Sequence, residues 1–428
     1  MPHPAPSPRR QHTRGHHSSS TGGWTDNVSS VRNTSLPSTR GRKTSTTVSP
    51  RSRQSSSQRD GGALTTAARL LAAVPLALTL LPLSRTGRGW VRVWDFPRAQ
   101  IAALATAAGA AMLAYARQTP ADRAITAALA ATVAYQTSKM LPYTPLYKRQ
   151  VPDAGGVPPE CCIRLFGANI LQENRRSDLV LDVIRHADPD VICLLETDAW
   201  WVRAMAPLER DYPWVTRHPL DNHYGMSLYS RLPVTSCDVR CLVSEDVPSM
   251  RAVIRLRSGD EVVIQALHPP PPLPNSPSYG RDAELVLAGQ AIHDDGRPTI
   301  VIGDLNDVAW SYTTTLFQRL SRMVDPRVGR GMYSTFHAEH RLARYPLDHV
   351  FHTRDFTLRE LRRLPYTGSD HFPILAELAF TPSRKHEVPP PVASQADLDD
   401  AVEMVEDARQ AEPYVNDDGE AEITRQPD

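Results

Sequence analysis

The sequence contains little cysteine, and the spacing of these residues excludes the common zinc modules. Its 428 residues include only five Cys, and none of them forms a Cys-x-x-Cys pair. Structural zinc sites are built largely from such pairs, so a zinc-stabilised fold is not expected. Cys237 and Cys241 could form a disulfide outside the cytoplasm, and free, partly buried thiols are an equal alternative.

Glycine-rich phosphate-binding motifs and a net charge are also missing. No Gly-x-Gly-x-x-Gly or Gly-x-x-x-x-Gly-Lys pattern occurs, so nucleotide-cradling folds have no support. The 48 Lys and Arg residues balance 47 Asp and Glu residues, and overall charge therefore says nothing about a polyanionic partner. Few of the basic residues are Lys, which together with abundant Ala and Pro is typical of a GC-rich, bacterial genome.

Charge and apolar residues are unevenly distributed along the chain. Residues 1–60 are basic and rich in Ser, Thr and Arg, whereas residues 382–428 are acidic. Both segments contain too few apolar residues to offset the entropy of ordering the chain. We therefore expect a disordered basic arm at the N-terminus and a disordered acidic tail at the C-terminus, in which a short helix near Leu398–Ala408 is possible.

Long apolar runs occur between 61 and 140. Ala63–Leu83 is apolar apart from Arg69 and three Thr, Ala99–Ala116 carries no charge, and Ala124–Ser138 is shorter. A bilayer core requires about 20 apolar residues in a helix. The pattern predicts two or three transmembrane helices, and hence a multi-pass protein of the cell membrane. A small soluble Ala-rich bundle is the alternative, which the missing polar stripe in Ala99–Ala116 disfavours.

The number of spans decides the side of the membrane on which the rest of the chain lies. Three spans with the basic arm inside would place the C-terminal part outside the cytoplasm, whereas two spans would leave it inside. We expect the extracytoplasmic arrangement. The Pro-rich segment 141–160 is interpreted as a linker to a domain over 161–381.

From Cys161 onward, short apolar runs of strand length alternate with helical patterns. Such alternation is typical of an α/β fold. The helices are expected at Arg176–His186 and Ser278–His293. The expected strands are Ile163–Ile170, Val191–Leu195, Met226–Tyr229, Ala252–Leu256, Val262–Leu267, Thr299–Ile302, Leu347–Phe351 and Ile374–Phe380.

Polar side chains that can do chemistry follow or precede these strands. Strand ends that meet at one edge of a sheet can form a single pocket, and carboxylate and amide oxygens suit Mg²⁺ or Mn²⁺ better than zinc. Taken singly, each residue has an ordinary structural explanation, such as a turn at Gly303–Asn306. The residues concerned are Asn169, Glu196, His268, Asp304, Asn306, Asp348, Asp370 and His371.

These residues lie in short sequence blocks whose order along the chain is similar to that of a known protein superfamily. In chain order the blocks are Gly-Ala-Asn-Ile (167–170), Leu-Leu-Glu-Thr (194–197), Tyr-Gly-Met-Ser-Leu-Tyr-Ser-Arg (224–231), Leu-His-Pro (267–269), Gly-Asp-Leu-Asn (303–306), Pro-Leu-Asp-His-Val (346–350) and Gly-Ser-Asp-His-Phe-Pro-Ile (368–374). Together they resemble the endonuclease/exonuclease/phosphatase superfamily over about half of the chain. The resemblance implies a four-layer α/β sandwich, in which two packed mixed β-sheets are covered by outer helices.

The resemblance also implies how a metal and a water molecule would be held. Glu196 is expected to bind Mg²⁺ or Mn²⁺, with Asn169 and Asp370 nearby as ligands or orienting groups. Asp304 is expected to align or deprotonate the attacking water.

The remaining residues are expected to contact phosphate. Asn306 would hold the phosphate or assist the nucleophile, and His268 would donate to a phosphate oxygen. His371 would contact the scissile phosphate, with Asp348 fixing its ring. Both imidazoles are expected to carry positive charge in the transition state. Other histidines, including His223, are expected to be surface or core residues.

These expectations lead to two functional hypotheses. The first is a divalent-metal-dependent phosphoesterase that acts on a phosphodiester or phosphomonoester, with an endonuclease among the options. The alternative is a catalytically silent membrane scaffold, which the complete set of site residues disfavours. The substrate could be nucleic acid, a lipid headgroup or a small molecule. The expected partners are this substrate and the lipid bilayer, with no sign of an obligate protein partner.

Overall fold

The computed structural model describes residues 51–273, 275 and 277–411. It divides into the units Met1–Gln54 and Ser55–Asp428, and the second unit holds all the described strands and helices apart from the first turn of α1 (Arg51–Leu80). The disorder predicted for 1–60 falls on residues outside the described part up to residue 50, whereas 51–60 form the start of α1. Residues 412–428 of the predicted tail also lie outside the described part.

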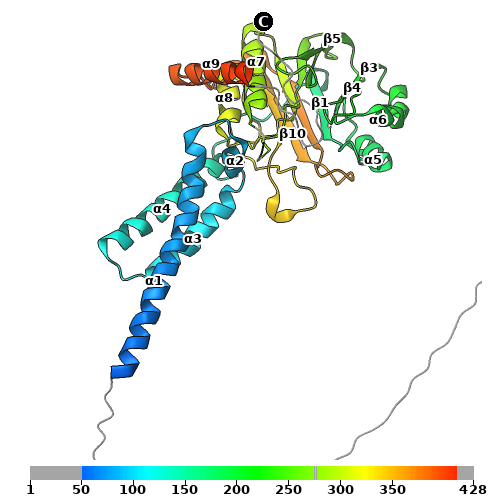
Figure 1. The fold of residues 1–428 in the computed structure, drawn as a ribbon. Coiled ribbons are helices and arrows are strands. Elements are labelled where there is room, and N and C mark those ends of the chain that lie inside the picture. The colour runs from blue at the N-terminus through cyan, green and yellow to red at the C-terminus, as the bar shows by residue number, and fades with distance from the viewer. Residues whose placement is uncertain (1–50, 274, 276, 412–428) are drawn as a thin grey trace, which may run out of the picture. The chain divides into compact units, whose positions relative to one another are not determined.

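Two mixed β-sheets form the centre of the α/β part (Figure 1). In the six-stranded sheet β1 and β2 pair in parallel, and the other neighbours pair antiparallel. Its order is β10 (Phe356–Arg363), β11 (Ile374–Phe380), β1 (Cys162–Asn169), β2 (Val191–Leu195), β4 (Met226–Ser230) and β3 (Trp214–His218).

The second sheet has five strands and also contains one parallel pair, β7 with β8. Its remaining neighbours are antiparallel. Its order is β5 (Val234–Cys241), β6 (Pro248–Arg255), β7 (Glu261–Ala266), β8 (Thr299–Asp304) and β9 (Asp348–His352).

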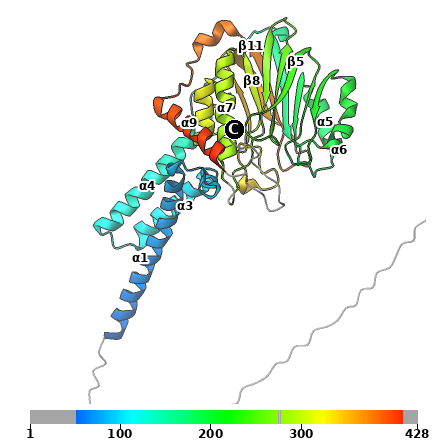
Figure 2. The ribbon, with the colours of Figure 1, turned by 45° about the horizontal axis from the view of Figure 1, so that its top comes forward.

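The two sheets pack face to face, with helices on the outside (Figure 2). Along β1, Ile163 and Leu165 join the core between the sheets, whereas Phe166 and Ala168 pack against the outer helices. Because both faces are covered, most of this strand is apolar instead of alternating with polar residues. The prediction of an α/β fold with two packed mixed sheets and outer helices is confirmed.

The outer helices bury one face each. The helices α5 (Ser177–Ala187) and α6 (Ala199–Ala204) cover the six-stranded sheet, while α7 (Tyr279–Asp295) and α8 (Tyr312–Ser321) cover the other. The chain also contains β3, β5, β10 and α8, which the sequence pattern did not predict. Strands such as β5 are largely exposed and carry polar residues, so their apolar pattern is weak.

The acidic segment after 382 is more ordered than the expected tail, and the helix that the sequence allowed near Leu398–Ala408 is present. This helix, α9 (Gln395–Gln410), begins with a capping box between Ser394 and Asp397. Ala401 is fully buried in a cluster with Val286 of α7 and Leu316 of α8. The few apolar residues of this charged helix therefore form one face, and burial of that face is enough to hold the helix on the domain.

The N-terminal segment is helical, and one part of it has the properties of a membrane span. It comprises α1 and the helices α2 (Gly89–Arg92), α3 (Arg98–Tyr115) and α4 (Pro120–Met140). Of the described residues, only the helical stretch Gly62–Ser84 is long and apolar enough to cross a bilayer.

The prediction of two or three spans in a multi-pass protein is not supported. The helix α3 consists mainly of Ala, which contributes little apolar surface, and α4 carries charged residues at both ends. Both pack against α1 in a cluster of mostly small residues that includes Ala72, Ala108 and Leu129.

The predicted alternative of a Cys237–Cys241 disulfide does not occur, and both thiols are free. The two residues lie four apart on β5. An extended strand separates such residues by roughly 13 Å, which is far beyond the reach of a disulfide. The fold therefore gives no argument from cysteine for an oxidising compartment.

A buried ion pair joins the N-terminal helices to the α/β part. Arg92 donates to Asp282 of α7 at 2.9 Å, and both side chains are almost fully buried. Asp282 also accepts from Arg281, whose guanidinium reaches the carbonyl of Asn306 at 3.3 Å. Nearby, the indole of Trp310 donates to the carbonyl of Asp95. The helices therefore contact the loop that follows β8.

We expect Arg92→Met to destabilise the folded chain by on the order of 3 kcal/mol, because a buried carboxylate loses one of its cationic partners. Thermal unfolding of the full chain measures the effect. The matched control is Arg85→Met, which removes an exposed pair with Asp400 and should cost less than about 1 kcal/mol. Equal effects of the two substitutions would show that the buried pair has no special role.

Candidate active site

The predicted site residues come together at one edge of the two sheets. Asn169 is the last residue of β1, Asp304 is the last of β8 and Asp348 is the first of β9. Glu196 directly follows β2, and His371 lies three residues before β11. The edge is shared because β1 and β2 are parallel and β8 packs opposite them across the core.

Glu196 lies at the centre of a hydrogen-bond network. Its Oε1 accepts from Asn169 Nδ2 at 2.7 Å, and its Oε2 accepts from the backbone N–H of Gln172 at 3.0 Å. Burial alone would raise the pKa of Glu196, but hydrogen bonds from His223, Gln172 and Asn169 outweigh it and lower the pKa to about 2. The side chain is therefore a carboxylate at neutral pH.

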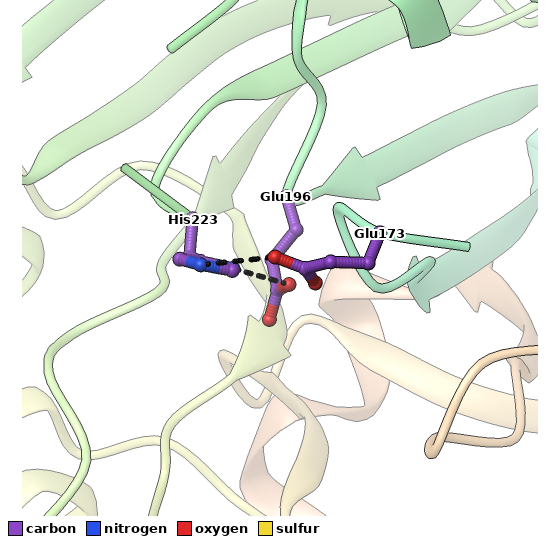
Figure 3. A group of neighbouring side chains, drawn as sticks. All are labelled: Glu173, Glu196 and His223. Atoms are coloured by element: carbon purple, nitrogen blue, oxygen red, sulfur yellow. Dashed lines mark hydrogen bonds and ion pairs between the residues drawn. The ribbon is translucent and has the colours of Figure 1, made fainter. Parts of the chain in front are cut away.

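His223 is an exposed residue, as the sequence allowed, and its ring also contacts this group. Its Nδ1 lies 3.3 Å from Glu196 Oε2, and its Nε2 lies 3.3 Å from Glu173 Oε1 (Figure 3). The hydrogen bond to Glu196 raises the pKa of His223. The three side chains are close enough together to hold one metal ion. Neither Glu173 nor His223 ends a strand, so the sequence pattern gave no signal for them.

His371 and two carboxylates form a second buried group. His371 Nδ1 lies 2.7 Å from Asp348 Oδ2, and its Nε2 lies 3.4 Å from Asp304 Oδ2. Although burial lowers the pKa of His371, the charges of Asp348 and Asp304 outweigh it and raise the pKa to about 10. An imidazolium with Nδ1 held by Asp348 directs its other N–H toward Asp304.

Asp304 connects the two groups. Its Oδ2 lies 3.3 Å from Asn169 Nδ2, and its Oδ1 accepts from the backbone N–H of Asn306 at 2.9 Å. Burial raises the pKa of Asp304 above its usual range, despite the opposing effect of the His371 charge. Asn306 in turn donates from Nδ2 to the carbonyl of Pro269 at 3.0 Å. A carboxyl group held at both oxygens is well positioned to orient a water molecule.

The glycine before Asp304 is required by a close backbone contact. A Cβ atom on Gly303 would lie 2.0 Å from the carbonyl oxygen of Leu267, and the residue has φ +155°. Only glycine permits this approach of β8 to the end of the β7 segment. The same approach brings His268, which follows Leu267, next to Asp304.

His268 differs in charge from the prediction. Burial lowers the pKa of His268 to about 4, so its ring is neutral near pH 7 and not an imidazolium. Its Nε2 lies 3.9 Å from Asp304 Oδ2. Its Nδ1 is buried without a hydrogen-bond partner among the described residues. A neutral imidazole still has one N–H to donate.

Asp370 is the least enclosed of the predicted metal-binding residues, since it is half-buried whereas Asn169 and Glu196 are buried. Its Oδ1 accepts from Ser369 Oγ at 3.3 Å, and Ser369 Oγ also donates to the carbonyl of Asn169 at 2.8 Å. Ser369 thus holds the 369–371 turn against the end of β1.

The donor set fits a hard divalent cation. Carboxylate oxygens of Glu196 and Asp304 lie within one hydrogen-bond network, in which the NH2 group of Asn169 donates to both, and Glu196 is ionised. Oxygen ligands of this kind favour Mg²⁺ or Mn²⁺. His223 adds a nitrogen next to Glu196, which also suits the transition metal Mn²⁺.

A comparison with protein-family models identifies the α/β part. Residues 163–371 match the model described as the Endonuclease/Exonuclease/phosphatase family. This segment belongs to that family. A comparison with curated proteins gives no match. The predicted family membership is therefore confirmed for the α/β part.

Several solved structures are similar to this endonuclease/exonuclease/phosphatase segment, each over 51% of the chain. The human Nocturnin catalytic domain is 19% identical, with a TM-score of 0.43 over 95% of its length. D. rerio TDP2 complexed with a single-strand DNA product is 15% identical, with a TM-score of 0.44 over 98%. A family protein from Beutenbergia cavernae is 18% identical, with a TM-score of 0.42 over 72%.

Proposed function

We propose that the protein hydrolyses a phosphate ester, either a diester or a monoester, with Mg²⁺ or Mn²⁺. One observation carries the proposal: an unbroken chain of contacts runs from Asp348 through His371 and Asp304 to Asn169 and Glu196. This chain combines carboxylates for a cation with a positively charged imidazole for a phosphate. Family membership of 163–371 supports the same class of reaction.

The metal side of the proposed site is centred on Glu196. Glu196 would bind the cation, with Asn169 and Asp370 as ligands or orienting groups. A bound divalent cation would supply positive charge beside the phosphate. Asp304 would align and deprotonate the attacking water, and its raised pKa makes it a stronger base than an ordinary carboxylate.

The phosphate side consists of three donors. His371, kept cationic by Asp348, would stabilise the charge that builds up on the phosphate oxygens. His268 would donate one hydrogen bond as a neutral ring, and Asn306 would hold the phosphate or the nucleophile. The raised pKa of His371 supports this assignment, because the ring stays protonated at neutral pH.

A silent scaffold would require that one of these groups be lost or misplaced. All the predicted residues are present, and Asn169, Glu196, Asp304, Asp348 and His371 are joined by hydrogen bonds or ion pairs. We therefore favour the hydrolase.

The full-length protein with Mg²⁺ should hydrolyse at least one substrate from a panel of plasmid DNA, RNA, sphingomyelin, phosphoinositides and bis(p-nitrophenyl) phosphate. Released product or phosphate is measured for each. An Asp304→Asn preparation purified in parallel controls for contaminating enzymes. If wild type and this variant release product equally across the panel, the proposed function is wrong.

We further propose that Gly62–Ser84 anchors the protein in a membrane as a single span. Large apolar side chains along it are exposed, including Leu70, Leu80 and Leu83. A single crossing with the basic arm inside would place the endonuclease/exonuclease/phosphatase segment outside the cytoplasm. Extraction of the protein from membranes by alkaline carbonate would contradict the anchor, and a reporter fused after Pro382 reads the orientation.

A further inference from the structure

A large hollow lies beside the proposed site, and arginines line it. Its volume is about 610 Å³. It lies between the loop before β9 and the end of the edge strand β10, and its lining includes Tyr333, Ser334, Arg341, Arg344, Arg362 and Arg363. None of the residues proposed for catalysis lines it.

Two of the arginines carry charge that no carboxylate neutralises. Arg344 donates to the carbonyl of His337 at 3.1 Å, and Arg363 donates to the carbonyl of Ser334 at 2.8 Å. Neither has an acidic partner within ion-pair distance in the part of the chain that the structure describes, unlike Arg362, which pairs with Glu360. Partial burial and the neighbouring Arg344 charge lower the pKa of Arg363, as expected for two cations held close together.

Both guanidinium groups are held in place by the same aromatic ring. The Cζ atom of Arg363 lies 4.4 Å from the centre of the Phe372 ring, and that of Arg344 lies 4.9 Å from it. Stacking and backbone acceptors fix the two groups before any ligand binds. Pre-positioned, unneutralised guanidinium groups are the form in which proteins bind phosphate.

A single layer of residues separates the hollow from the site. Phe372 follows His371 in the chain, and its backbone N–H donates to the carbonyl of Thr335 at 3.1 Å. Thr335 Oγ1 accepts from the backbone N–H of Asp348 at 3.2 Å. The centre of the Phe336 ring lies 4.9 Å from that of the His371 ring. The hollow thus lies next to residues that contact His371 and Asp348, within reach of the groups that would follow the scissile phosphate in a longer substrate.

We propose that this hollow binds the phosphates next to the scissile one in a nucleic acid strand, so that the substrate is a polynucleotide. The inference rests on the proposed phosphoesterase function and names its substrate class. A single phosphate is much smaller than the hollow, and Arg341 offers a further exposed cation at its rim. Four of the seven lining residues are arginines and one is a tyrosine, which suits a charged backbone and stacked bases better than acyl chains.

The test compares a long and a short substrate in the full-length protein. Arg344→Met combined with Arg363→Met should raise KM for a single-stranded oligonucleotide of about 12 nucleotides by about tenfold, with little change in kcat. Hydrolysis of bis(p-nitrophenyl) phosphate, which does not reach the hollow, should stay unchanged. Because two phosphate contacts are lost, the slope of log affinity against log salt should become shallower by about 1–2.

Two further variants make the result specific. Arg255→Met removes an exposed arginine on β6, where Glu261 neutralises it, and should leave KM for the oligonucleotide unchanged. Lysine at both positions 344 and 363 keeps the charge and should restore most of the salt dependence. A merely structural role of the arginines would not produce this pattern.

Several outcomes would overturn the proposal. One is an unchanged KM for the oligonucleotide in the double variant. Another is an equal fall in kcat/KM for the oligonucleotide and for bis(p-nitrophenyl) phosphate. A third is a fall in kcat/KM that is confined to a phosphoinositide in vesicles or to a soluble inositol phosphate. Binding of a labelled oligonucleotide in EDTA tests the hollow without hydrolysis, and so separates the proposed binding site from the proposed phosphoesterase function. A wild type that hydrolyses no ester contradicts that function, whereas oligonucleotide binding that requires the two arginines still supports the hollow as the binding site.

Discussion

Replacing Asp304 with Asn should lower kcat by at least about 10², a typical loss when a general base or a positioning carboxylate is removed. The amide keeps the shape of the side chain and can still accept from Asn306, but it can neither take a proton nor hold His371 by charge. His371→Ala should cause a loss of similar size, because it removes the cation that faces the phosphate.

Steady-state kinetics on whichever panel ester the wild type hydrolyses measure these losses, and far-UV circular dichroism checks the fold. His186→Ala is the matched control, since this histidine is exposed on α5 and pairs with Asp182 of the same helix. It should leave kcat unchanged. Wild-type turnover in either the Asp304 or the His371 variant would show that the assigned role is wrong.

Removing the divalent cation should abolish hydrolysis, and Glu196→Gln should weaken metal binding by at least about 10²-fold. The reason is that Glu196 is an ionised carboxylate whose two oxygens are already oriented by Asn169 and Gln172. Excess EDTA followed by Mg²⁺ or Mn²⁺ tests the requirement, and titration calorimetry of the purified full chain measures the affinity.

Glu173→Gln is the informative comparison for that experiment. Glu173 is an exposed residue whose Oε1 lies 3.3 Å from His223 Nε2, while the other nitrogen of that ring faces Glu196. We expect a smaller loss of metal affinity, about tenfold, because Glu173 is exposed and reaches Glu196 through the His223 ring. Full activity in excess chelator, or an unchanged affinity in Glu196→Gln, would contradict a metal centre at Glu196.

Much of the site could be predicted from the sequence because it is encoded locally. Asn169, Glu196 and Asp304 each follow a short apolar run, and such a run becomes a buried strand wherever the core closes over it. The order of these strand ends carried the family resemblance, which the match over 163–371 confirms. The prediction of two packed mixed sheets then came from the resemblance to the family and not from the apolar pattern of any single segment.

The sequence was least informative where local pattern and tertiary context differ. The Ala-rich helices α3 and α4 resemble membrane spans in composition, yet they pack on α1 through buried Ala side chains and carry a buried hydrogen bond from Arg98 to Gln136. The polar strand β5 and the acidic helix α9 have weak apolar patterns, and only their packing on neighbouring elements stabilises them.

The sequence by itself thus determined the fold class and the residues that meet at the strand ends. Only the tertiary structure decided their charges, because a pKa depends on burial and on neighbours that are distant in the chain. It makes His268 neutral and His371 cationic, although both were expected to be charged. It also places His223 next to Glu196 and Arg344 next to Arg363. Both contacts join residues that are distant in the chain, and the periodicity of the sequence gives no information about such contacts.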